Sequence, residues 1–304
     1  MGLNTIQGIY APTSRACVPF LVPKDKLVRA NSILETVNSL ANMVAPPAAG
    51  ILLAGFGLIP ILVVSGICFA VTAVMDLLIN IPYKKQQADR NILRTMKSDM
   101  RQAFNFVGKN TILIKLAILM FILSLLIPGV FNVGVPVFVM QRLGMSTGYF
   151  GLGRAIAFSG GILGGTIAGA LGKKLTVRSV PLTSILLGLS IVPIGFAIWI
   201  NISYFMAFAV IVASDFISAL VLVLWMVPIW AYIQTITPPE LSGKVMSLLS
   251  GLPMIAMGLG LLLFGMLFQR FDSAPWHIVF ITTAICCIAA LLLRKHFREV
   301  KVEK

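Results

Sequence analysis

Charged residues are scarce in this sequence. Asp, Glu, Lys and Arg make up 11% of its 304 residues, whereas an ordinary soluble domain has about 25%. Apolar residues make up 58% and fall into runs separated by short polar interruptions. Runs of about 20 apolar residues are the length that a helix needs to cross a hydrocarbon core of about 30 Å. A soluble globular protein is therefore excluded, and the sequence predicts an all-α, polytopic transmembrane protein in a lipid bilayer.

Histidine, cysteine and paired acidic residues are too few, or wrongly placed, for chemistry inside a membrane. The two histidines, His277 and His296, lie at the ends of apolar runs, and no two acidic residues recur at helical spacing within one run. An embedded enzyme needs facing acid, base or nucleophile side chains, so we expect no enzyme. The four cysteines lie inside apolar runs, so we expect neither a metal site nor a cofactor. No ATP-binding Gly-x-x-x-x-Gly-Lys loop occurs in the sequence. If the protein carries out active transport, we therefore expect an ion gradient and not ATP to supply the energy.

The apolar runs predict nine membrane spans, the first of them short. Their expected ranges are 2–21, 33–56, 59–81, 112–140, 147–171, 180–200, 203–234, 245–268 and 276–293.

The net charge of +14 gives these spans a direction. Basic residues cluster in the loops that follow the first, third, fifth and seventh spans and in the C-terminal tail, whereas the alternate loops hold only Arg142 and Arg270. By the positive-inside rule the basic loops are cytoplasmic. We therefore expect a multi-pass protein of the inner (cytoplasmic) cell membrane with a cytoplasmic C-terminus. No aromatic-interleaved basic module accompanies the charge, so nucleic-acid binding is not expected.

The longest polar interruption, residues 82–110, has the pattern of an amphipathic helix. Met96, Met100, Ala103, Phe104 and Val107 recur at spacings of three and four residues, beside basic side chains. This pattern favours a helix that lies on the inner leaflet and joins two bundles. A solvated linker is the alternative.

The chain repeats itself at an offset of 215 residues. "VPKDKLVRANSIL" (22–34) lies over "TPPELSGKVMSLL" (237–249), so that Pro23 matches Pro238 and Arg29 matches Lys244. Upstream, Tyr10 falls on Trp225. Both copies follow a span that runs toward the basic side, which indicates a parallel repeat, one of the two plans used by transporters. Three further spans precede the second copy but not the first, which suggests a truncated first half; a complete nine-span protein is the alternative.

Residues 10–57, "YAPTSRACVPFLVPKDKLVRANSILETVNSLANMVAPPAAGILLAGFG", resemble the fourth to fifth helices of major facilitator superfamily exporters, closest to the macrolide-efflux and enterobactin-exporter branch. The resemblance implies a partial N-terminal bundle (1–81), a cytoplasmic linker (82–110), a complete six-helix C-terminal bundle (111–294) and a cytoplasmic tail (295–304). It also implies secondary, proton-coupled efflux of a drug-like or siderophore-like small molecule by alternating access, through a protein that is monomeric when full length. A truncated, transport-inactive fragment is the alternative.

Two departures from the family pattern concern helix packing and gating. The antiporter signature Gly-Pro-x-x-Gly-Gly of the fifth helix keeps Pro46 and Gly50 but has alanine at its other glycine positions, with Pro47 following Pro46. Small side chains there still allow close helix approach. The loop "GALGKKLTVR" (169–178) has Gly172 where an acid is usual. We assign gating or packing roles to Pro46, Pro47, Gly50, Arg29 and Lys244.

Charged residues inside spans are candidates for function because each is costly to bury. Asp215 is expected near the bilayer midplane, with Ser218 one turn further and Trp225 beyond it, as a proton-coupling or substrate-contacting carboxylate; an internal ion pair is the alternative. Arg154 either pairs with Asp215 or extends outward to the headgroups.

The remaining polar residues of the spans have simpler explanations. Arg15 lies within reach of the cytoplasmic headgroups, and Ser32-x-x-Glu35 has the spacing of a helix-capping box. Asn38, Asn42, Asn132 and Tyr10 are expected to hydrogen-bond either a substrate or another helix. With Asp215, Arg154, Trp225 and Ser218, these four residues form the predicted pathway for substrate and protons.

Overall fold

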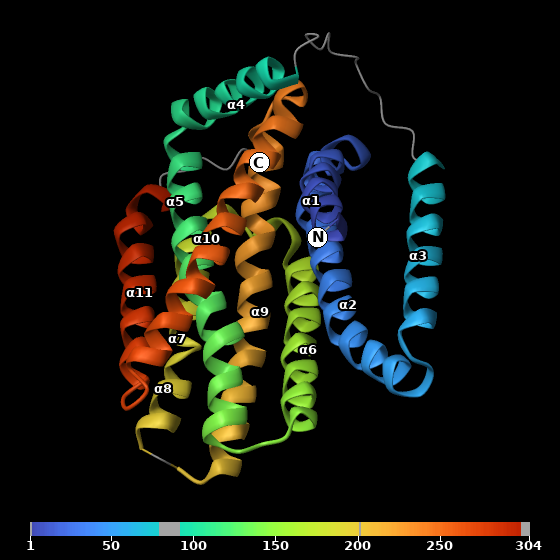
Figure 1. Ribbon diagram of the computed structural model, residues 1–304. Coiled ribbons are helices and arrows are strands. Elements are labelled where there is room, and N and C mark those ends of the chain that lie inside the picture. The colour runs from blue at the N-terminus through green and yellow to red at the C-terminus, as the bar shows by residue number, and fades with distance from the viewer. Residues whose placement is uncertain (1, 79–91, 201, 299–304) are drawn as a thin grey trace.

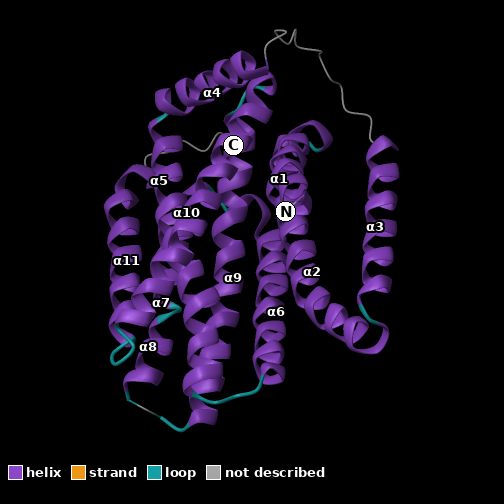
Figure 2. Cartoon of the chain, viewed as in Figure 1, coloured by secondary structure: helices purple, strands orange, loops and turns teal. Residues whose placement is uncertain are grey.

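A computed structural model describes residues 2–78, 92–200 and 202–298 of the chain, and these residues form helices and short connections without a strand (Figure 2). The helices are α1 (Gly2–Leu21), α2 (Leu27–Phe56), α3 (Leu58–Leu78), α4 (Ile92–Lys109), α5 (Thr111–Gly129), α6 (Thr147–Leu171), α7 (Val180–Leu189), α8 (Val192–Trp199), α9 (Tyr204–Ile236), α10 (Ser242–Arg270) and α11 (Trp276–Arg298). Within the described ranges, seven segments are long and apolar enough to cross a membrane; α1 and α2 are not among them. The predicted all-α, polytopic fold class is confirmed.

Prolines modify two of the predicted spans. The span expected at 112–140 is α5 followed by two π-helical turns, Val130–Gly134 and Val137–Arg142, which begin after Pro128 and Pro136. The span expected at 180–200 is interrupted after Leu189, and α8 starts with a proline in its first turn. Because proline lacks a backbone N–H, the helix cannot keep regular hydrogen bonding at these points.

The loops alternate between two ends of the molecule (Figure 1). The α1–α2 and α9–α10 loops lie at the same end as α4, and the α2–α3 and α10–α11 loops lie at the opposite end. A contact of 3.6 Å between Lys173 Nζ and Asp25 Oδ2 places the α6–α7 loop at the first end too. We call this the basic end, defined by Lys24, Lys26, Arg29, Lys173, Lys174, Arg178 and Lys244. The predicted separation of basic loops from Arg142 and Arg270 is thus present in the described part of the chain.

The sequence repeat is also a structural repeat. Pro23 (φ −58°, ψ 150°) and Pro238 (φ −59°, ψ 146°) each precede a single turn of 3-10 helix, Lys24–Lys26 and Pro239–Leu241. The turns close with equivalent hydrogen bonds, from Lys26 N to Pro23 O at 2.9 Å and from Leu241 N to Pro238 O at 3.0 Å. Each turn leads into a long helix that runs away from the basic end (Figure 1). The α1–α2 and α9–α10 pairs therefore share one local conformation.

Helix α6 packs between α2 and α9 through glycines on two of its faces. A Cβ at Gly165 would overlap the Thr36 hydroxyl of α2, and a Cβ at Gly160 would overlap the Phe216 carbonyl of α9. Helix association in membranes depends on such close backbone approach, because no hydrophobic effect drives it. The α2–α6 contact joins the N-terminal helices to the C-terminal bundle.

Helix α3 stands apart from the bundle (Figure 1). None of its residues is buried, although it is among the most apolar helices of the chain.

Helix α4 lies across the basic end and falls within residues 82–110, where a helix is expected; residues 82–91 lie outside the described residues (Figure 1). Ala103 and Val107 are buried against the bundle, whereas Met100 and Phe104 are half exposed. The α10 residue Lys244 holds the helix, since its Nζ lies 2.8 Å from Asp99 Oδ1 and donates to Gln102 Oε1 at 2.9 Å.

Candidate functional site: two ion pairs between helices

The first ion pair joins α6 to α9. Arg154 Nη1 donates to Asp215 Oδ2 at 2.8 Å, and the Asp215 side chain is 11% exposed. Asp215 lies about 17 Å along α9 from Tyr204, well inside a hydrocarbon core of about 30 Å. Of the two alternatives for Arg154, the structure has the ion pair and not an outward extension to the headgroups. The pair satisfies two charges that would each be costly to bury alone.

Asn132 and Phe158 complete the surroundings of this pair. Arg154 Nη2 lies 3.4 Å from Asn132 Oδ1, which comes from the π-helical turn after α5. The guanidinium carbon lies 5.0 Å from the centre of the Phe158 ring. A cavity of about 10 Å³ lies beside the pair, lined by both charged residues and by apolar side chains of α6, α9 and the segment that continues α5. A cavity of this size is at the lower limit for holding one water molecule.

Ser218 and Trp225 follow Asp215 along α9 but contact other groups. The Ser218 hydroxyl lies 2.5 Å from that of Ser190, at the break between α7 and α8. The Trp225 side chain is buried, and its Nε1 has no hydrogen-bond partner among the described residues. Trp225 lies about 15 Å along the helix from Asp215, so the two do not form one compact cluster.

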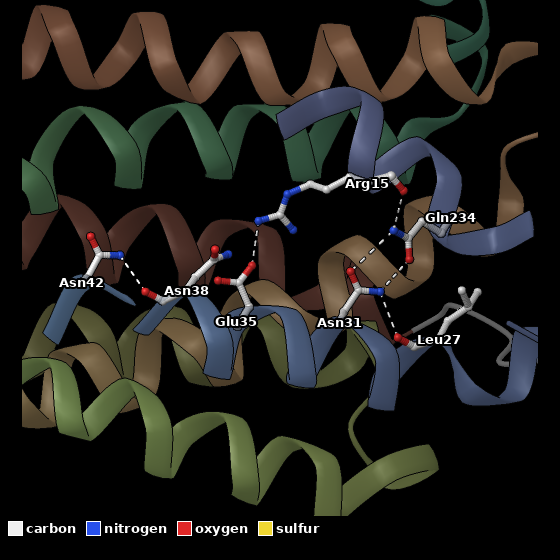
Figure 3. A network of polar contacts seen from close by, with 7 residues as sticks. All are labelled: Arg15, Leu27, Asn31, Glu35, Asn38, Asn42 and Gln234. Atoms are coloured by element: carbon white, nitrogen blue, oxygen red, sulfur yellow. Dashed lines mark hydrogen bonds and ion pairs between the residues drawn. The ribbon is translucent and has the colours of Figure 1, made fainter. Parts of the chain in front are cut away.

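The second ion pair, Arg15 with Glu35, corrects two expectations. Arg15 Nη2 donates to Glu35 Oε1 at 2.7 Å, so Arg15 does not extend to the headgroups (Figure 3). The capping box is wrong because α2 begins at Leu27; Ser32 lies inside the helix, and its hydroxyl donates to the Arg29 carbonyl at 2.7 Å. The Arg15 guanidinium carbon also lies 4.5 Å from the centre of the Trp230 ring of α9.

A signal for this second pair was present in the sequence. Arg15 and Trp230 are separated by the repeat offset of 215 residues, and so are Glu35 and Ser250. In transporters built from repeats, substrate and ion sites lie at the interface between the repeats.

The ion pair belongs to a polar stripe along α2, which Figure 3 shows from the side. Asn31, Glu35, Asn38 and Asn42 recur at spacings of four, three and four residues and so share one helix face. Asn31 is fully buried, whereas Asn38 and Asn42 are exposed and joined by a hydrogen bond from Asn42 Nδ2 to the Asn38 carbonyl at 2.8 Å. The stripe is therefore closed toward the basic end and exposed further along the helix.

The other predicted residues are dispersed. Tyr10 of α1 is 48% exposed, and Arg29 is exposed at the start of α2. Pro47 is exposed, whereas Pro46 and Gly50 lie outside the residues whose side-chain surroundings are described. Lys244 contacts α4 through the two bonds given above, which sequence reasoning did not foresee.

Comparisons with known proteins agree with this architecture. The chain is 22% identical to macrolide efflux protein A of Streptococcus pyogenes over 303 residues, covering 97% of this chain and 71% of that protein. It is 23% identical to macrolide efflux protein A of Enterococcus faecalis over 261 residues, covering 83% of this chain and 76% of that protein.

A similar fold occurs in the crystal structure of a bacterial homologue of the iron transporter ferroportin in an outward-facing state. The TM-score is 0.62 at 17% identity, over 93% of this chain and 66% of that chain, so this chain spans just under two thirds of that structure. A profile of the Major Facilitator Superfamily matches residues 3–252. The chain therefore belongs to the Major Facilitator Superfamily, a family of membrane transporters.

Proposed function

We propose that this chain works in proton-coupled efflux of a drug-like or siderophore-like small molecule across the cell membrane. The similarity to two proteins named for macrolide efflux supports export. The positive-inside rule supports a cytoplasmic basic end and, with it, a cytoplasmic C-terminus. The observation that carries proton coupling is the Arg154–Asp215 contact of 2.8 Å inside the membrane.

Protonation of Asp215 is the proposed coupling step. Opening the pair while Asp215 is charged leaves two unpaired charges in the bilayer, which costs about 3–5 kcal/mol. A proton on Asp215 removes one of these charges, so α6 and α9 separate at lower cost. Arg154 then keeps Asn132 as a hydrogen-bonding partner. Proton binding and helix movement are thereby coupled through a single contact.

Alternating access requires that the basic end open toward the cytoplasm. In the structure this end is closed by hydrogen bonds between α1, α2, α9 and α10, including Ser242 Oγ to the Ala16 carbonyl at 3.1 Å. The α2–α6 glycine contact provides the axis about which the N-terminal helices turn against the C-terminal bundle. Substrate enters along the exposed part of the α2 stripe once these basic-end contacts part.

The domain organisation is part of the proposal. Residues 111–294 form one six-helix bundle, and residues 1–81 form part of another, followed by the linker with α4. The absence of any buried residue in α3 supports a partial N-terminal bundle, because a bundle helix normally buries one face. The same observation favours the alternative that this chain, by itself, is inactive in transport.

Cells that express the 304-residue chain provide the test. We expect lower retention of a macrolide or a fluorescent dye than in cells without the chain, and loss of this difference when a protonophore collapses the gradient. Asp215→Asn should abolish efflux. Asp272→Asn is the control and should leave efflux unchanged, because it alters an exposed carboxylate at the end of the molecule opposite to the basic end. Equal, gradient-dependent efflux by the wild type and Asp215→Asn would eliminate the coupling role. Failure of the correctly inserted wild type to transport would instead establish the inactive alternative.

A further inference from the structure

The Arg15 guanidinium lies between a carboxylate and an aromatic face that come from different helices. Glu35 of α2 accepts a hydrogen bond from Arg15 Nη2 at 2.7 Å, and the centre of the Trp230 ring of α9 lies 4.5 Å from the guanidinium carbon. A carboxylate with an indole face is a favourable environment for an organic cation, because the negative ring face adds to the carboxylate's attraction. Tryptophan is the best of the aromatic side chains in this role.

Arg15 fits this environment incompletely. Its Nη1 is buried and has no hydrogen-bond partner within the described part of the chain. A buried donor without a partner loses its hydration and gains nothing in return. The Arg154 guanidinium differs, since Asn132 contacts it in addition to Asp215. Of the two ion pairs, Arg15–Glu35 is therefore the one from which an external cation displaces the arginine more easily.

The position of Glu35 gives a ligand access to it. The Arg15 and Glu35 side chains are 17% and 10% exposed, so neither is sealed off. The next residues along the α2 stripe, Asn38 and Asn42, are exposed, and Figure 3 shows them in line with Glu35. The opposite side is closed, because Asn31 is completely buried and bonded to Gln234. An amphipathic molecule that follows the stripe thus meets Glu35 at its closed end.

We propose that Glu35 and Trp230 form a binding site for organic cations, and that the Arg15 side chain occupies this site when no ligand is present. The ligand class is lipophilic or amphipathic organic molecules with one cationic group, whether a protonated amine or a quaternary ammonium or phosphonium. On binding, the cationic group takes the place of the guanidinium, and Arg15 turns toward the exposed side of the stripe. The proposal rests on the transport function above and specifies its substrate class.

The competition between Arg15 and the ligand has a distinctive consequence. If the arginine only stabilises the fold, its removal weakens binding or leaves it unchanged. If the arginine competes with the ligand, its removal strengthens binding, because Glu35 is then free. A hydrogen bond to a charged group is worth about 1.5–3 kcal/mol, which corresponds to roughly tenfold or more in affinity.

The test measures equilibrium binding of tetraphenylphosphonium to the purified 304-residue chain in detergent, without any gradient. We expect Glu35→Gln and Trp230→Leu to weaken binding about tenfold or more, and Arg15→Gln to strengthen it by a similar factor. Trp230→Phe, which keeps an aromatic face, should retain most of the affinity. Asp272→Asn is the matched control for loss of one carboxylate. Unchanged or weaker binding by folded Arg15→Gln overturns the proposal.

A double variant distinguishes loss of the binding site from loss of the folded structure. Arg15→Gln with Glu35→Gln keeps the net charge and leaves no unpaired ion, and its elution profile in gel filtration should match the wild type. We expect this folded double variant to bind tetraphenylphosphonium as weakly as Glu35→Gln alone; wild-type affinity would overturn the proposal. Because no transport is measured, loss of binding at Glu35 is distinguishable from loss of coupling at Asp215.

Discussion

Asn31 of α2 and Gln234 of α9 face each other through their carboxamides, although 203 residues separate them in the chain. Asn31 Nδ2 donates to Gln234 Oε1 at 2.6 Å, and Gln234 Nε2 donates to the Arg15 carbonyl at 3.0 Å. Both side chains are almost completely buried. These bonds tie α1 and α2 to α9 just beside the Arg15–Glu35 pair (Figure 3). The basic end is thus closed by polar contacts between the two halves and not by apolar packing alone.

Replacement of one amide should therefore destabilise the closed end. Gln234→Leu leaves the Arg15 carbonyl without its partner and leaves one Asn31 Nδ2 proton unpaired, while the other still donates to the Leu27 carbonyl. We expect a loss of about 1–3 kcal/mol in the free energy of unfolding. Adding Asn31→Leu should recover part of this loss, since one unpaired buried group is then removed. Thermal unfolding in detergent measures both changes. Asn31→Leu alone completes the comparison. If the loss of stability in the double variant equals the sum of the losses in the two single variants, the two amides are not coupled.

Gly165 provides a test of the α2–α6 interface. Gly165→Ala places a methyl group against the Thr36 hydroxyl, and we expect a destabilisation of about 1–3 kcal/mol from overpacking. Thr36→Ala in the same chain should restore part of the stability. Gly151→Ala, in the same helix with open space around it, is the control and should be neutral or stabilising. The account of helix packing fails if the two glycine variants unfold at the same temperature.

The contact of Lys244 with α4 predicts a local effect. Lys244→Gln removes the ion pair with Asp99, and we expect faster hydrogen exchange in residues 92–109 with little change elsewhere, because this partly exposed pair contributes about 1 kcal/mol or less. Exchanging the two charges, with Lys244→Asp and Asp99→Lys, should slow the exchange again. Equal exchange rates in the wild type and Lys244→Gln would mean that Ala103 and Val107 alone hold the helix.

Variants of the Arg154–Asp215 pair should affect stability and transport differently. Asp215→Asn leaves Arg154 charged and unpaired, so we expect a loss of about 3–5 kcal/mol in the free energy of unfolding. The double variant with Arg154→Gln should recover most of that stability, because no unpaired ion remains. Neither variant should restore gradient-dependent efflux. Restored efflux in the double variant would assign the pair a purely structural role.

The sequence predicted the elements that depend on local pattern. The range 147–171 expected for one span is that of α6, and the repeated Pro23 and Pro238 turns have almost the same backbone angles. Apolar run length and short motifs contain this information, because they act within a few residues.

Contacts between distant helices were harder to predict. Ser32 and Glu35 have capping-box spacing, but the proline-led turn before α2 starts the helix at Leu27, which leaves Glu35 free to meet Arg15. The choice of the ion pair for Arg154 depended in the same way on how α6 packs against α9. Such choices depend on packing geometry and not on residue type.

Proton movement driven by substrate is the sharpest test of coupling through the Arg154–Asp215 pair. The 304-residue chain would be reconstituted into liposomes that contain a pH-sensitive dye, and an outward macrolide gradient would be imposed without any initial pH difference. We expect the wild type to move protons into the liposomes as the macrolide leaves, and the Asp215→Asn, Arg154→Gln double variant to move none. Equal proton movement by the wild type and by this charge-balanced double variant would show that the pair does not couple proton and substrate movement.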